Sequence, residues 1–123
     1  MKSREQINRL IAEESAELQM LRTAITKAET SNGEGGGLRA LLRKSKRAEQ
    51  MLLHYLDMRR IIDVFSENQL RIHQNRLRMQ VDRIVQSSRA FSDDPKIQRE
   101  YRTQRGLPRL QAQVKDLNWL LDE

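Results

Sequence analysis

The chain contains no cysteine, which excludes disulfides, thiol catalysis and cysteine-ligated metal sites. Long apolar runs are also missing, because no stretch approaches the roughly 18 apolar residues of a membrane-spanning helix. Residues 1–10 are polar and lack the apolar segment of a signal peptide. We therefore expect a cytoplasmic protein that does not associate with membranes.

Glycine and proline are absent from residues 38–91, and good helix formers occur throughout this range. A run of this kind predicts one or two long α-helices and an all-α protein. Within it, Ser66 and Gln69 have the spacing of a capping box, in which a serine and a glutamine three residues later close a helix start. The run is therefore expected either to continue through this point or to bend or break there.

Aromatic residues are scarce, at 4% of the chain, and hydrophobic residues reach only 37% while charged residues reach 33%. This is a small apolar supply for a domain that must offset the conformational entropy lost on folding. Chains of this kind often complete their core by self-association or by binding a partner. Composition thus indicates a protein that binds other proteins, copies of itself, or both.

The order of helix signals predicts a single helical domain over residues 1–123. Ser3 and Gln6 match a capping box at the first helix, Asp94-Pro95 reads as a helix start, and Gly106 fits a helix end. The expected helices span 3–30, 38–65 continuing or kinked into 66–91, 95–105 and 108–122. Four glycines in residues 31–37 predict a flexible connector.

The first two expected helices are equally long and are joined by a short connector, so they predict an antiparallel αα-hairpin with paired positions summing to about 68. An apolar heptad seam runs along the first helix. Residues 51–65 are apolar around most of the helix circumference, which predicts the centre of the core. We expect the hairpin to extend into a three- to four-helix bundle or a coiled-coil-like assembly.

Chemistry-bearing residues form no recognisable catalytic pattern. His54 and Asp57 could supply two metal ligands from one helix face, but no second pair completes a site. Glu13, Glu14 and Glu17 cluster on the first helix, where solvated contacts are the ordinary role of glutamates. We therefore expect no enzyme activity, cofactor, metal or small-molecule substrate.

The net charge of +6 is unevenly distributed, since residues 37–123 contain eighteen Lys/Arg and eleven Asp/Glu. Helical rows of arginine can follow phosphates without reading a base sequence, although an acidic protein face or solvent would suit them equally. The candidate anion or nucleic-acid contacts are Arg39, Arg43, Lys44, Lys46, Arg47, Arg71, Arg76, Arg78 and Arg83.

These features together favour a non-enzymatic helical interaction protein: an adaptor, an assembly factor or a small subunit of a larger complex, which could be a nucleoprotein complex. A sequence-nonspecific nucleic-acid-binding protein is one alternative, and a small inhibitor that docks on an enzyme or a nucleoprotein machine is another. The candidate partner interface consists of apolar seam residues from the first and last helices, with Trp119 off the seam line: Ile7, Ile11, Leu18, Leu21, Ile25, Leu117, Trp119 and Leu121.

Overall fold

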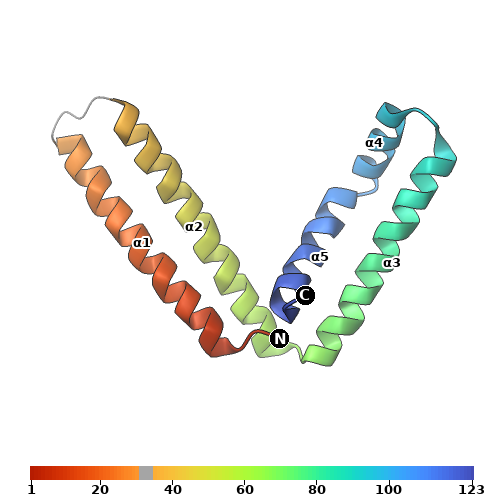
Figure 1. Cartoon of the computed structure of the whole chain (residues 1–123), viewed down its shortest axis with the longest axis horizontal. Coiled ribbons are helices and arrows are strands. Elements are labelled where there is room, and N and C mark those ends of the chain that lie inside the picture. The colour runs from red at the N-terminus through yellow and green to blue at the C-terminus, as the bar shows by residue number, and fades with distance from the viewer. Residues whose placement is uncertain (31–34) are drawn as a thin grey trace. The chain divides into compact units, whose positions relative to one another are not determined.

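The computed structural model describes residues 1–30 and 35–123, and it is all-α as predicted, with no strand in those ranges. The helices in chain order are α1 (Arg4–Thr30), α2 (Gly35–Val64), α3 (Glu67–Phe91), α4 (Pro95–Gln104) and α5 (Leu107–Leu121) (Figure 1). The chain divides into two compact units, Ser3–Val64 and Met1–Lys2 with Phe65–Glu123. We call them the hairpin unit and the three-helix unit and describe each separately.

In the hairpin unit, α1 and α2 lie side by side and run antiparallel (Figure 1). The backbone N–H of Gln6 donates to Ser3 Oγ at 3.1 Å and that of Ser3 donates to Gln6 Oε1 at 2.8 Å, which is the reciprocal capping box. Two ion pairs join the helices, Arg4 with Asp63 and, at 3.5 Å, Arg22 with Glu49. Because these carboxylates and cations are exposed, packing contributes more to the pairing than charge does.

The buried apolar residues of the hairpin unit include a narrow cluster of Leu18, Leu21 and Ala48, against which Leu41 and Leu52 pack, together with Ile7 and Met58. Residues 51–65 were predicted to form the centre of the core. Met58 is the single buried apolar residue among them, so the prediction is wrong for most of this range. A helix packed on one neighbour within its unit can cover only one stripe of its surface there. Apolar residues on the other sides of α2 are half-buried or exposed.

The predicted connector over residues 31–37 is partly corrected. Residues 31–34 lie outside the described residues, whereas Gly35 and Gly37 belong to the first turn of α2. Glycine is unfavourable in a helix by about 1 kcal/mol relative to alanine, but this cost does not forbid helix formation when the following residues propagate it.

The run without glycine or proline breaks after Val64, and α3 begins at Glu67. Ser66 has an extended backbone and accepts the Gln69 N–H at 3.2 Å, while Gln69 Oε1 accepts the Ser66 N–H at 2.8 Å. The capping box satisfies two backbone donors that a new helix start leaves open. Local side-chain chemistry, without a helix-breaking residue, therefore accounts for the division between the units.

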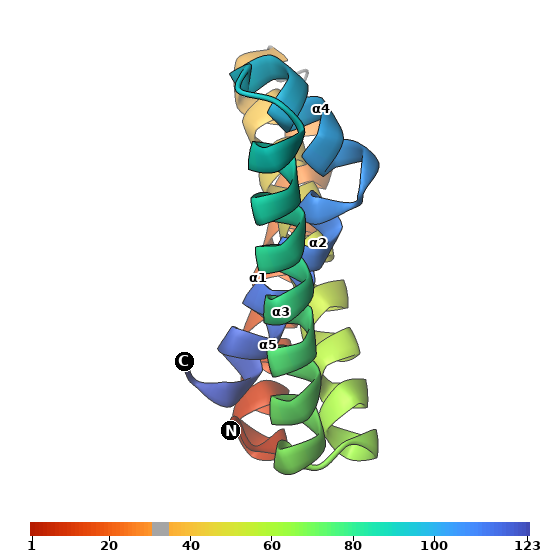
Figure 2. The same cartoon turned by 90° about the vertical axis from the view of Figure 1, so that its right-hand side faces the viewer.

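In the three-helix unit, α3 lies alongside α5, and α4 lies between them in sequence and contacts both (Figures 1 and 2). Although α3 is rich in Arg, Gln and Asn, it buries Leu70, Gln74, Leu77 and Ser88. The two polar side chains are hydrogen-bonded: Gln74 donates to Asn118 at 2.6 Å, and Ser88 accepts from Arg102 at 2.9 Å. Pairing removes most of the penalty for burying them.

The turns of this unit follow the predicted signals. Asp94 accepts the Lys96 N–H at 2.9 Å at the start of α4, with Pro95 in the first turn. Gly106 follows the end of α4 with a φ of 75°, in the left-handed region that costs glycine little. A side chain at Gly106 would meet no steric contact, so its backbone conformation is what favours glycine there.

A cluster of ion pairs closes the C-terminal end of α5. Lys2 donates to Asp122 at 2.6 Å and to the carbonyl of Trp119 at the same distance, and Arg71 pairs with Glu123. The hydrogen bond from Lys2 holds the pKa of Asp122 below its ordinary value of 3.8. The hydrogen bond from Arg71 holds the pKa of Glu123 below 4.5. Because these pKa values are lowered in the folded state, folding stability depends on both carboxylates being ionised.

The three-helix unit should lose stability in acid. A carboxylate with a lowered folded-state pKa stabilises above its unfolded pKa, and this contribution is lost as pH falls through the folded value, here from about pH 5 downward. We expect Asp122→Asn with Glu123→Gln to flatten the pH dependence of the melting temperature, measured by circular dichroism. Glu100→Gln, at an exposed α4 position, is the matched control and should keep the wild-type slope. An unchanged slope in the double variant would contradict this account.

Candidate interaction surfaces

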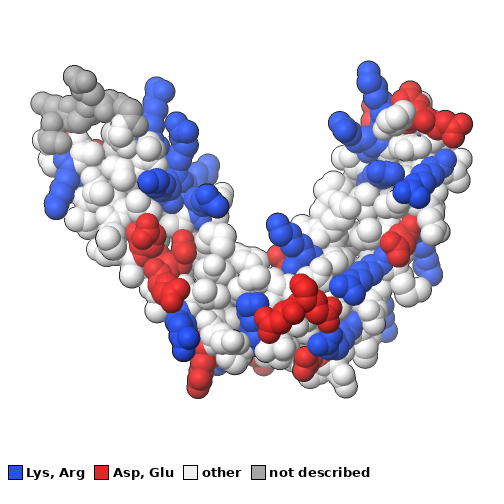
Figure 3. Space-filling view, viewed as in Figure 1, with Lys and Arg blue, Asp and Glu red and all other residues white. Residues whose placement is uncertain are grey.

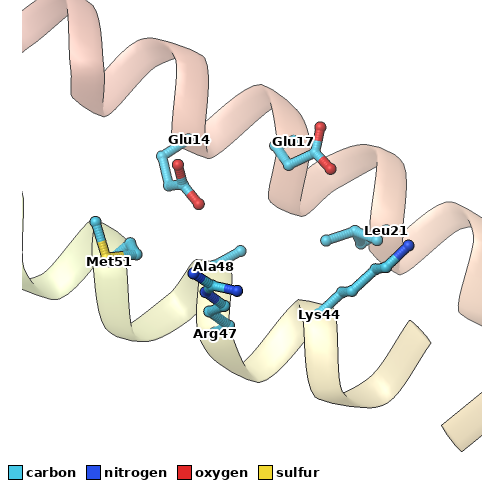
Figure 4. Close-up of a pocket in the computed structure, with 7 residues that line it drawn as sticks. All are labelled: Glu14, Glu17, Leu21, Lys44, Arg47, Ala48 and Met51. Carbon is cyan, nitrogen blue, oxygen red and sulfur yellow. The ribbon is translucent and has the colours of Figure 1, made fainter. Parts of the chain in front are cut away.

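A shallow, open hollow lies between α1 and α2 in the hairpin unit, with a volume of about 330 Å³ (Figure 4). Glu14 and Glu17 project from α1, and Lys44 and Arg47 project from α2. The remaining lining residues are apolar: Leu21, Ala48 and Met51. The hollow thus has two carboxylates, two cations and an apolar base, and its formal charges balance.

The chemically active groups of the hollow are the carboxylates of Glu14 and Glu17 and the amine of Lys44, and none of its seven lining residues is a serine, threonine, cysteine or histidine. Burial, and then the charges of Glu14 and Glu13, raise the pKa of Tyr55 above its ordinary value of 10.0. In the described residues, no group of three His, Cys, Asp or Glu side chains is placed to hold a metal ion.

The basic cluster at 39–47 is divided by helix geometry into two sets. Lys44 and Arg47 line the hollow beside the glutamates of α1. Arg39, Arg43 and Lys46 lie on the side of α2 turned away from α1, because each residue advances about 100° around a helix and Leu41, Ala48 and Leu52 face α1.

All five cations are exposed, and Figure 3 shows lysine and arginine gathered over this part of α2. We call Arg39, Arg43 and Lys46 the outward cations. Among the described residues, none of these three forms a salt bridge. Unlike Lys44 and Arg47, which lie beside the glutamates of α1, they do not line the hollow.

The predicted arginine row on α3 is likewise divided. Arg71 bonds Glu67 and Glu123, and Arg78 bonds Asn118 at 2.9 Å and lies 3.6 Å from Glu123. These two therefore stabilise the three-helix unit. Arg76 and Arg83 are exposed, and the described part of the chain provides neither with a salt bridge. The structure thus leaves two of the four α3 arginines in the predicted set available to an anion.

The predicted partner-interface residues lie mostly inside the protein. Five of them are buried and three are half-buried. The buried ones are Ile7, Leu18, Leu21, Leu117 and Leu121, and the half-buried ones are Ile11, Ile25 and Trp119. Leu18 and Leu21 are covered by α2, so the heptad seam pairs α1 with its own chain at this point.

Two apolar side chains that we did not single out are exposed beside the outward cations. Leu42 is 48% exposed and Leu53 is 61% exposed, and their separation of eleven residues places them near one line along α2. Val64 continues this spacing and is also exposed. The eleven-residue repeat is present in the sequence, but the abundance of apolar residues in 51–65 obscures it.

Among residues 1–30 and 35–123, none of the helices combines the length and apolar character needed to cross a membrane. Comparisons of the chain with protein-family models, with curated proteins and with solved structures each found no match. Function is therefore inferred from the surfaces of the protein itself.

The two sets of cations should affect stability differently. Lys44→Glu with Arg47→Glu places four carboxylates around the hollow, so like-charge repulsion should lower the melting temperature in low salt. Arg39→Glu with Arg43→Glu makes the same charge change on the side of α2 turned away from the glutamates of α1, and should not lower it. The difference should shrink in 1 M salt, where the Debye length is about 3 Å. Equal effects of both double variants would contradict this division of the cluster.

Proposed function

We propose that this protein is a non-enzymatic helical interaction protein: an adaptor, an assembly factor or a small subunit of a larger complex in the cytoplasm. Its partner is a protein, another copy of the chain, or both. The observation that carries the proposal is the exposure of Leu42 and Leu53 on α2. Burying a leucine side chain contributes roughly 1.5–3 kcal/mol, so a partner that covers both gains substantially.

The proposed mechanism is helix addition. In the hairpin unit α1 covers one stripe of α2, and a partner helix would pack on another, completing a three- to four-helix bundle or a coiled-coil-like assembly. No cofactor, metal or small-molecule substrate takes part in this mechanism. An inhibitor that docks on an enzyme or a nucleoprotein machine would use the same surface and is a special case of the proposal.

Leu53→Glu should weaken association strongly, because it places a carboxylate in an apolar contact. We expect light scattering of the purified chain to give a mass above the 14.5 kDa monomer, or affinity capture with nuclease present to retain a partner protein. The variant should weaken whichever association is found by at least about tenfold, a change of 1.4 kcal/mol.

Gln86→Glu adds the same charge at an exposed polar position of α3 and should retain association, so it is the matched control. A compact monomer at every concentration that also captures no protein would overturn the proposal.

Sequence-nonspecific nucleic-acid binding is the second candidate, favoured by the outward cations. It predicts a gel shift with DNA or RNA that weakens steeply as salt rises, since binding to phosphates releases counterions. Arg39→Glu with Arg43→Glu should abolish the shift, whereas Lys44→Glu with Arg47→Glu should reduce it less because those cations already face glutamates. No shift at low salt would remove this candidate.

A further inference from the structure

We propose that α2 binds an acidic amphipathic helix of a partner protein through the outward cations Arg39, Arg43 and Lys46 together with Leu42 and Leu53. We call these five residues the α2 docking surface. The inference rests on the proposed function, because it specifies the chemistry of the partner that an interaction protein would bind.

The charge of this surface calls for an anionic partner. Arg39 and Arg43 are four residues apart and Arg43 and Lys46 are three apart, so their side chains are neighbours on the helix. Like charges at these spacings destabilise a helix by about 0.2–0.5 kcal/mol per pair. No aspartate or glutamate occurs from residue 35 to residue 48, and Glu49, three residues after Lys46, pairs with Arg22 at 3.5 Å. A carboxylate-bearing partner would relieve this repulsion.

The apolar part of the surface calls for a partner with apolar side chains. Leu42, three residues after Arg39, is 48% exposed, and Leu53 is 61% exposed. The two leucines are about 16 Å apart along the axis at 1.5 Å per residue. A partner helix whose apolar residues recur over three turns can reach both at once.

Nucleic acid fits this combination less well. A phosphate backbone has no apolar group that would cover Leu42 or Leu53. Residues 38–53 also contain no aromatic side chain on which a base could stack. Charge and apolar area together therefore favour an acidic protein helix over nucleic acid.

The surface also has a direction. The outward cations occupy residues 39–46, at the N-terminal end of the described surface, whereas Leu53 lies about two turns further along the helix. A partner helix with carboxylates clustered at one end and leucine-like side chains at the other would satisfy both parts in one orientation. Electrostatic complementarity of this kind sets orientation and specificity more than it sets affinity.

The test uses the full-length chain and three synthetic peptides of about 20 residues that share one leucine pattern spanning three helical turns or more. Their remaining positions carry mainly glutamate, glutamine or lysine, and binding is measured by fluorescence anisotropy at low salt. We expect the glutamate peptide to bind at least about tenfold more tightly than the glutamine peptide, a difference of about 1.4 kcal/mol, and the lysine peptide not to bind.

Variants locate the site. Arg39→Glu with Arg43→Glu should weaken binding of the glutamate peptide at least about tenfold, and Leu53→Gln should weaken it as well. Arg76→Glu with Arg83→Glu makes the same charge change on exposed residues of α3 and should leave binding unchanged. Circular dichroism of each variant checks that helicity is retained, and Arg39→Gln with Arg43→Gln should give an intermediate loss.

Three results would overturn the inference: equal binding of the glutamate and glutamine peptides, equal losses from the α2 and α3 double variants, or tighter binding of an RNA or DNA oligonucleotide than of the glutamate peptide. The last result would assign the outward cations to nucleic acid. If the chain self-associates or captures a partner but does not bind the glutamate peptide, this inference fails while the proposed function stands.

Discussion

The packing of Ala48 against Leu18 and Leu21 is the contact on which the hairpin unit depends. A small side chain at Ala48 lets α1 and α2 approach closely, and Leu41 and Leu52 extend the same stripe along α2. Because this stripe is narrow, the stability of the pair comes from a few well-placed side chains, while ion pairs such as Arg22–Glu49 are exposed and contribute little. Because α1 covers only this stripe of α2, Leu42 and Leu53 remain exposed outside it.

The three-helix unit also has few apolar residues, but its interior includes polar side chains. It buries Gln74 and Ser88 and pairs them with Asn118 and Arg102, so polar contacts replace part of an apolar core. Arg71 and Arg78 are similarly occupied by the end of α5. Arg71 and Arg78, which look available in the sequence, are thus part of the framework, whereas Arg76 and Arg83 form no salt bridge in the described part of the chain.

Local signals in the sequence predicted the helical class and several helix ends, because Ser66, Asp94 and Gly106 act through contacts within a few residues. Burial could not be predicted in the same way. Residues 51–65 looked like a core centre because they are apolar, but which of them is covered depends on where α1 runs. The surface was missed for the same reason: Leu42 and Leu53 differ from Leu41 and Leu52 by one position each, and only the direction of α1 separates the packed leucines from the exposed ones.

The adjacency of Leu52 and Leu53 provides the most direct test of how α1 packs on α2. Hydroxyl-radical labelling of the dilute purified protein, resolved to single residues by mass spectrometry, compares Leu52 with Leu53 inside one peptide. We expect Leu53 to be labelled much more heavily than Leu52, and its labelling to decrease when a partner or a second copy binds. Equal protection of Leu52 and Leu53 in the dilute protein would contradict the claim that the packing with α1 leaves one side of α2 uncovered.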